Sequence, residues 1–129
     1  LRHPDNAALN AFGTQLEEIA AGEAEPCSVE IRRLVDAPSN GFDEGLKAQI
    51  RASADRHGFP RLDLLSAAGH DARQMARLTR SAMIFIPCRG GVSHHPDEWA
   101  EPAHVAAGAA VLLDLLLEEA GVSFNQGDA

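Results

Sequence analysis

The chain has few cysteines, and their spacing excludes the sites that cysteines usually build. Cys27 and Cys88 are its only two among 129 residues, and they form no Cys-x-x-Cys pair. Neither a disulfide framework nor a zinc ribbon is therefore indicated, and both thiols are expected to be packed. Separated thiols fit a reducing compartment, and no signal peptide is visible. A cytoplasmic location is expected.

Basic residues are also scarce, because 11 Lys and Arg stand against 19 Asp and Glu, for a formal charge of -8. Such a chain repels a phosphate backbone and an anionic membrane, so no nucleic-acid or membrane partner is expected. Long apolar runs are absent too. The best candidate, Val105 to Leu117, is interrupted by Asp114. It is also shorter than a membrane span, which needs roughly 18 residues or more. It predicts a buried helix.

What is present is the length and the apolar share, 45 %, of an ordinary domain. Apolar residues at three- and four-residue steps predict a first helix over about 5 to 21, carrying Leu9, Phe12, Leu16 and Ile19 on one face. The same argument predicts helices from Leu46 to Gly58, over 71–78, and from Pro102 to Gly121. Alternating or continuous apolar residues predict strands over 27–36, 62–65 and 82–86. The tail, 124–129, is expected to fray.

Helices that alternate with short strands indicate an α/β fold, with a subdomain boundary near 38–42, where Pro38, Asn40 and Gly41 gather. Open α/β sheets place ligand sites in the loops at strand ends. Two such loops carry polar side chains.

The first loop is Ser66-Ala67-Ala68-Gly69-His70-Asp71-Ala72. Small residues let backbone approach a ligand, and the amide groups at the start of the following helix would favour a carboxylate or an oxyanion. The simpler interpretation is that Asp71 caps the helix and that His70 is a turn residue.

The second loop runs from Gly90 to Trp99 and holds His94, His95, Asp97 and Glu98. Imidazole and carboxylate side chains suit a divalent metal, although adjacent histidines point in different directions and only one would ligate a given ion. A polar loop with histidines by chance is the alternative. No further cluster has ligand-like spacing, and Gly-x-Ser-x-Gly and Walker-type glycine loops are absent. The chain therefore offers part of a metal site at most.

These strings, in order, resemble a known family. Ser-Ala-Ala-Gly-His-Asp-Ala (66–72), Ala-Met-Ile-Phe-Ile-Pro (82–87) and Gly-Val-Ser-His-His-Pro-Asp-Glu-Trp (91–99) are similar to motifs in the C-terminal half of the hydantoinase/carbamoylase amidases. This group of M20-like metallohydrolases includes N-carbamoyl-L-amino acid hydrolases, β-ureidopropionases and allantoate amidohydrolases. Leu1-Arg2-His3 is similar to the end of the family's Asp-(Ile/Leu)-Arg strand. Ala67 stands where the family usually has Gly, and His95 where Ser is common.

The resemblance implies a role for each matching residue. His94 would ligate one of two bridged divalent metals (Zn²⁺, Mn²⁺ or Co²⁺, two per complete active site), and Gly69 and His70 would contact substrate. Arg2 would bind the substrate carboxylate, since guanidinium grips carboxylates with two parallel bonds. From the residues alone, Arg2 and His3 are by default a surface pair. Glu98 would at most orient the loop around the metal ligand. The family's other ligands, its Glu general base, and its assisting His and Asn lie N-terminal to the matching part.

The resemblance also implies an architecture. Residues 1–40 would complete an α+β lid or dimerisation subdomain that makes a homodimer, and residues 41–129 would form the C-terminal part of the catalytic domain, with part of a zinc-exopeptidase-like mixed sheet flanked by helices. The whole would be a dinuclear amidohydrolase that cleaves the C–N bond of N-carbamoyl-L-amino acids or related ureido acids. The alternative is a non-catalytic module, a stand-alone remnant or interaction domain, because most metal ligands and the general base are missing.

Overall fold

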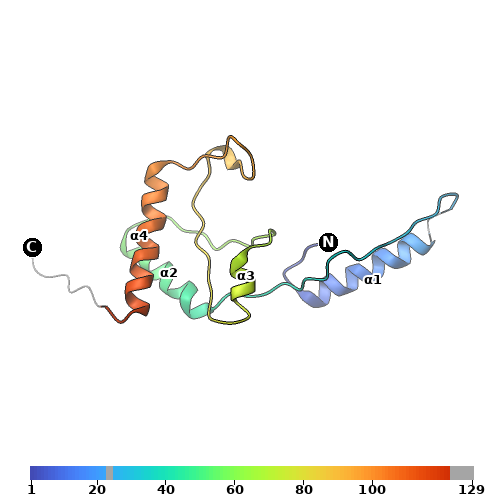
Figure 1. Ribbon diagram of the computed structural model, residues 1–129, viewed down its shortest axis with the longest axis horizontal. Coiled ribbons are helices and arrows are strands. Elements are labelled where there is room, and N and C mark those ends of the chain that lie inside the picture. The colour runs from blue at the N-terminus through green and yellow to red at the C-terminus, as the bar shows by residue number, and fades with distance from the viewer. Residues whose placement is uncertain (23–24, 123–129) are drawn as a thin grey trace, which may run out of the picture. The chain divides into compact units, whose positions relative to one another are not determined.

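A computed structural model describes residues 1–22 and 25–122, and its regular elements are helical (Figure 1). They are α1 (Asn6–Gly22), α2 (Glu44–Arg56), α3 (Asp71–Met75), the 3-10 turn η1 (Arg89–Gly91) and α4 (Pro102–Glu119). Every predicted helix is observed, although α3 is shorter than expected. The expected burial of the last helix is wrong, because Val111 is the one buried residue along α4. In the part described, none of the helices is both long and apolar enough for a membrane span. The tail expected to fray lies outside the described residues.

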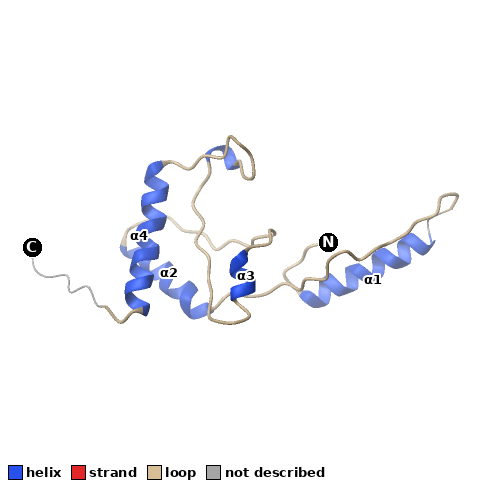
Figure 2. Cartoon of the chain, viewed as in Figure 1, coloured by secondary structure: helices blue, strands red, loops and turns tan. Residues whose placement is uncertain are grey.

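The three predicted strands are not confirmed. Across 1–22 and 25–122 the structure contains no β-strand, and the segments 27–36, 62–65 and 82–86 run as loops (Figure 2). A strand exists only through hydrogen bonds to a neighbouring strand, whereas a helix bonds within itself. None of the three segments pairs with another in the described part of this chain. The helical half of the α/β expectation is therefore observed, and the sheet is not.

By their contacts the residues divide into two units. The first unit is 1–41 together with 64–70, and the second is 42–63 together with 71–129. The expected assignment of 1–40 to a lid subdomain and of 41–129 to a catalytic domain stays a prediction.

In the first unit, α1 begins where Asp5 accepts a hydrogen bond from the Ala7 amide at 2.8 Å. Such a bond satisfies one of the amide groups that a helix start leaves unpaired. Asn6 and Ser39 then exchange two bonds, from Asn6 Nδ2 to the Ser39 carbonyl (2.9 Å) and from the Ser39 amide to Asn6 Oδ1 (2.7 Å). This pair holds the chain near residue 39 against the start of α1.

The predicted apolar face of α1 is not buried. Phe12, Leu16 and Ile19 are 45 %, 46 % and 53 % exposed. The spacing is that of a helix packed on one side, but one helix and one loop do not provide enough surface to cover it. Cys27 is likewise exposed, so its expected packing is wrong, while Cys88 in the second unit is half-buried.

The second unit is built on the pair of α2 and α4. Ser53 on α2 is 1 % exposed, and its hydroxyl donates to Asp114 Oδ2 on α4 at 2.7 Å. Arg56 donates to the same oxygen (3.1 Å) and to Glu118 (2.6 Å), and His57 lies 3.1 Å from Asp114 Oδ2. The bond from Ser53, then those from Arg56 and His57, hold the pKa of Asp114 below its usual range. The Asp that interrupts the apolar run is thus the polar link between the helices.

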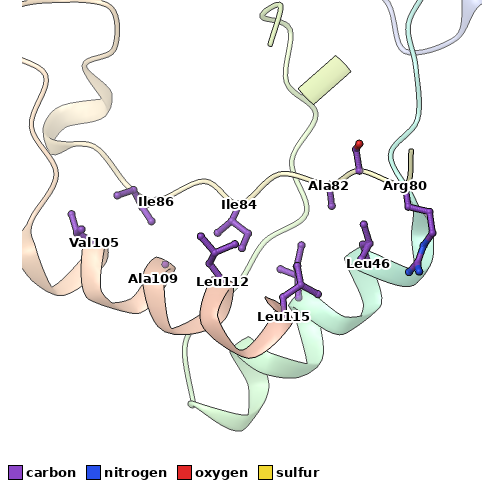
Figure 3. A pocket seen from close by; sticks show the side chains of 12 residues that line it. Leu46, Arg80, Ala82, Ile84, Ile86, Val105, Ala109, Leu112 and Leu115 are labelled. Carbon is purple, nitrogen blue, oxygen red and sulfur yellow. The ribbon is translucent and has the colours of Figure 1, made fainter. Parts of the chain in front are cut away.

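The segment 80–86 crosses α2 and α4 and encloses an apolar groove of about 530 Å³ with them (Figure 3). Gly108 permits the closest approach, because a Cβ there would lie 2.6 Å from Ile86 Cγ2. At the other end, Asp43 caps α2 by accepting from the Leu46 amide (2.8 Å) and pairs with Arg80 (3.3 Å). The groove is lined by Leu46, Ile50, Arg80, Ser81, Ala82, Ile84, Ile86, Val105, Gly108, Ala109, Leu112 and Leu115.

The lowered pKa of Asp114 predicts an acid-sensitive helix pair. Because this pKa is lower in the folded than in the unfolded chain, ionised Asp114 contributes stability that is complete above the unfolded value and is lost as the pH falls through the folded value. Asp114→Asn, which keeps an acceptor for Ser53, should show a smaller fall in the free energy of unfolding between pH 6 and pH 3. Asp114→Ala should lose about 1–3 kcal/mol at pH 6, because the Ser53 hydroxyl is left unpaired. Urea unfolding of the full-length enzyme, followed by circular dichroism, measures both, and equal pH profiles for wild type and Asp114→Asn would contradict the assignment.

Candidate functional site

The first group of candidate residues lies within the first unit, where Arg2 meets the loop 66–70. Arg2 Nη1 donates to the Ala67 carbonyl at 2.5 Å, across 65 positions of sequence. In the same loop Ser66 Oγ lies 2.7 Å from His70 Nε2 and accepts from the Ala68 amide at 3.3 Å. The structure therefore brings Arg2, expected to bind a carboxylate, to the loop that carries Gly69 and His70.

The loop 66–70 accommodates Ala67, which stands where the resembling family usually has Gly. Among the residues described, His94 is the only non-glycine with a positive φ, so Ala67 fits without the strain that such a φ would impose. Gly69 has no heavy atom within 4 Å of where a Cβ would stand, which leaves its backbone open to approach. The loop leads into α3, whose first residue is Asp71.

The second group of candidate residues lies in the loop 88–101 of the second unit. Its two ends are joined, since the Arg89 amide donates to the Trp99 carbonyl at 2.7 Å. The Arg89 guanidinium lies 5.5 Å from the centre of the Trp99 ring and bonds Glu101 at 2.9 Å. Gly90 and Gly91, with φ of 62° and 70°, make the turn that enters the loop. These glycines thus shape the loop.

Within this loop the two histidines have different surroundings. His95 Nδ1 accepts from the Asp97 amide at 3.2 Å and lies 3.5 Å from the Asp97 carboxylate. The His94 side chain is exposed, and among the described residues its ring makes no hydrogen bond or ion pair; only its amide is engaged, with Glu98 Oε2 at 2.9 Å. An imidazole with both nitrogens available fits the part of a metal ligand.

One ligand does not make a metal centre. No group of three or more His, Cys, Asp or Glu side chains that could hold an ion occurs in the part of the chain that the structure describes. A divalent site needs three or four protein ligands. Among the described residues, His94 would therefore provide one of the ligands of such a site, and the others would have to come from elsewhere.

Several contacts of these loops have no counterpart in the sequence analysis. The Ser66 to His70 pair could have been found, since Ser66 lies four positions earlier in the same small-residue loop. The link from Cys88 Sγ to Glu98 Oε1, at 3.8 Å, and the closure of the loop by Arg89 and Trp99 could not, because no spacing rule relates those positions.

Comparison with known proteins decides the family. The profile of the Peptidase family M20/M25/M40 matches residues 3–118. The chain belongs to this family. It is 35 % identical over 126 residues to an N-carbamoyl-L-amino-acid amidohydrolase of Rhizobium meliloti, covering 95 % of this chain and 30 % of that protein. It is also 41 % identical over 75 residues to an allantoate amidohydrolase of Bacillus subtilis, covering 58 % of this chain and 18 % of that protein.

Solved structures agree. The chain aligns with a hydantoinase/carbamoylase family amidase of Burkholderia vietnamiensis with a TM-score of 0.79 and 37 % identity, over 92 % of this chain and 29 % of that one. A hydantoinase/carbamoylase family amidase of Burkholderia ambifaria gives a TM-score of 0.81 at 33 % identity, over 95 % and 29 %. The fold is M20-like, and the chain spans less than a third of the length of these relatives. The resemblance to this family is confirmed.

Proposed function

We propose that this chain is the C-terminal portion of a metal-dependent amidohydrolase that cleaves the C–N bond of N-carbamoyl-L-amino acids or related ureido acids. The observation that carries the proposal is the bond from Arg2 to Ala67, which joins two segments of the family pattern in one place. Relatives named for N-carbamoyl-L-amino acid and allantoate hydrolysis support this substrate class.

Arg2, Gly69 and His70 form the substrate-binding part of the proposal. A guanidinium has several N–H donors, so a bond to the Ala67 carbonyl leaves donors for the two oxygens of a substrate carboxylate. The backbone at Gly69 is sterically open, and Ser66 restrains His70. Together they provide a cation and hydrogen-bonding groups for the carboxylate end of the substrate, which is not the end that reacts.

His94 is the proposed metal ligand, one of several in a complete site with two Zn²⁺, Mn²⁺ or Co²⁺ ions. When bound, such ions polarise a carbonyl and make water nucleophilic at neutral pH. The exposed His94 ring supports its selection over His95, whose Nδ1 already accepts the Asp97 amide. The other ligands and the general base would come from residues outside this chain.

We also propose a homodimer formed through residues 1–40. Support comes from the half-exposed stripe of α1, because an apolar helix face of this kind is normally covered by protein. The stripe consists of Phe12, Leu16 and Ile19. The cytoplasmic location stays a prediction.

Substitution of Arg2 tests the substrate assignment. In the full-length enzyme, Arg2→Ala should raise KM for an N-carbamoyl-L-amino acid about 10- to 100-fold, the effect of losing a charge-assisted bond. Arg2→Lys should restore little, because an ammonium lacks the planar fork of a guanidinium. Arg33→Ala is the matched control, since Arg33 pairs with Glu17 and Asp36 in the same unit. Equal KM values for Arg2→Ala and the control would refute the role.

The second candidate, a non-catalytic module, is favoured by the lack of a three-residue metal cluster among the described residues. We expect this 129-residue chain alone to show no hydrolysis of N-carbamoyl-L-amino acids with added Mn²⁺ or Zn²⁺, whereas a full-length enzyme that contains it turns over. Inactivity of both proteins would favour the module. Turnover by the isolated chain comparable to that of a complete enzyme would show that its site is not partial.

The two histidines give a separate test of the metal assignment. In the full-length enzyme, His94→Ala should lose metal on dialysis because a ligand is removed, and His95→Ala should keep most of it. Elemental analysis of the dialysed proteins gives the number of ions per chain. The reverse pattern would assign the ligand to His95.

A further inference from the structure

His94 adopts a backbone conformation that costs energy. Its φ is 57°, in the left-handed region, and within 1–22 and 25–122 no other non-glycine residue has a positive φ. A residue with a Cβ is disfavoured in this conformation, because the Cβ comes too close to the following carbonyl oxygen. Something in the surrounding loop must therefore hold it, and strain of this kind is concentrated at functional positions.

Glu98 makes hydrogen bonds to His94 and to the residue that follows it. Its Oε2 accepts the His94 amide at 2.9 Å, and its own amide donates to the His95 carbonyl at 2.9 Å. The side chain and the backbone of one residue thus close the turn that runs from His94 to Glu98. A carboxylate that accepts a backbone N–H makes a stronger bond than a neutral acceptor does.

The carboxylate is itself restrained. Its second oxygen, Oε1, lies 3.8 Å from Cys88 Sγ, at the position where the chain enters the loop. The Arg89 amide donates to the Trp99 carbonyl at 2.7 Å and so joins the ends of the loop. This bond fixes Trp99, the residue that follows Glu98. Glu98 is therefore anchored on both sides.

We propose that Glu98 is a positioning residue, which holds His94 in the left-handed conformation and so keeps its ring available to a metal ion. This inference rests on the proposed function, because it takes His94 as a ligand. It adds that Glu98 itself does not ligate the metal but acts through the backbone of residue 94. Asp97, the neighbouring carboxylate, contacts His95 instead and has no such role.

The experiment compares three variants of the full-length enzyme. Glu98→Ala removes the acceptor and should weaken Zn²⁺ or Mn²⁺ binding about 10- to 100-fold, the usual effect of losing a residue that orients a ligand. Glu98→Gln keeps a carbonyl oxygen for the His94 amide and should bind within about threefold of wild type. Asp97→Ala is the matched control and should also stay close to wild type. Isothermal titration of the metal-free proteins gives each affinity.

A second readout needs no metal. In the metal-free protein labelled with ¹⁵N-histidine, the His94 amide should exchange slowly with solvent in wild type and Glu98→Gln, and rapidly in Glu98→Ala. If Glu98→Ala fails to fold, as judged by circular dichroism, Glu98→Gln decides: retained affinity with a slow amide supports the proposal, and loss of either overturns it.

The outcomes separate the two proposals. If wild type binds no divalent metal, the proposed function fails. If wild type binds metal and Glu98→Ala binds it equally well, the function stands and the positioning role is wrong. Equal loss of affinity in Glu98→Ala and Glu98→Gln would also overturn it, because that result requires the charged oxygen itself at the metal.

Discussion

The hydrogen bond from the buried Ser53 hydroxyl to Asp114 is the constraint on which the second unit depends. It joins α2 to α4, which are the only two regular elements in contact within the described part of the chain. The segment 80–86 packs on this pair, and Ile86 lies so close to Gly108 that a Cβ there would clash with it. The loop that carries His94 begins directly after that segment and ends at Pro102, the first residue of α4. Both ends of the loop that carries His94 are therefore attached to the helix that Asp114 fixes.

The helices could be predicted because their determinants are local. Asp43 caps α2, Pro102 begins α4, and glycines follow at positions 58 and 121 with φ of 68° and 69°. Each of these acts within a few residues of the element that it bounds. The strands depend on partners that the sequence pattern does not contain, so alternation over 27–36 describes a surface suited to a sheet and cannot provide the sheet. The apolar face of α1 is likewise visible in the sequence, but the surface that would cover it is not, and the face lies exposed.

The candidate site also has parts that the sequence predicts and parts that only the structure shows. Local pattern selected the loops 66–72 and 90–99, because small and polar residues after an apolar segment are visible in sequence. Nothing local relates Arg2 to Ala67, 65 positions away, and only the family resemblance placed Arg2 in the site. The family resemblance already favoured His94 over His95, and the atomic positions add a physical reason, because Asp97 contacts the His95 ring and Glu98 accepts the His94 amide. The metal-ligand role of His94 is still a prediction, but its surroundings now distinguish it from its neighbour.

The extent of burial favours the proposal that this chain is part of an enzyme over the alternative that it is a self-sufficient module. Within the described residues the buried apolar side chains are Leu46, Ala54 and Val111, while α1 and α4 leave Phe12, Ile19, Leu113 and Leu116 about half exposed. Ordering a chain of this length costs conformational entropy at every residue, and burial of apolar surface is the main term that offsets it. Three such side chains provide only part of that term. The conformation shared with the much longer amidases, at a TM-score of 0.79 to one of them, therefore leaves apolar surface that protein outside these 129 residues would cover. The same surface is where the pairing partners of the segments 27–36, 62–65 and 82–86, and the remaining metal ligands of the proposed enzyme, would have to reside.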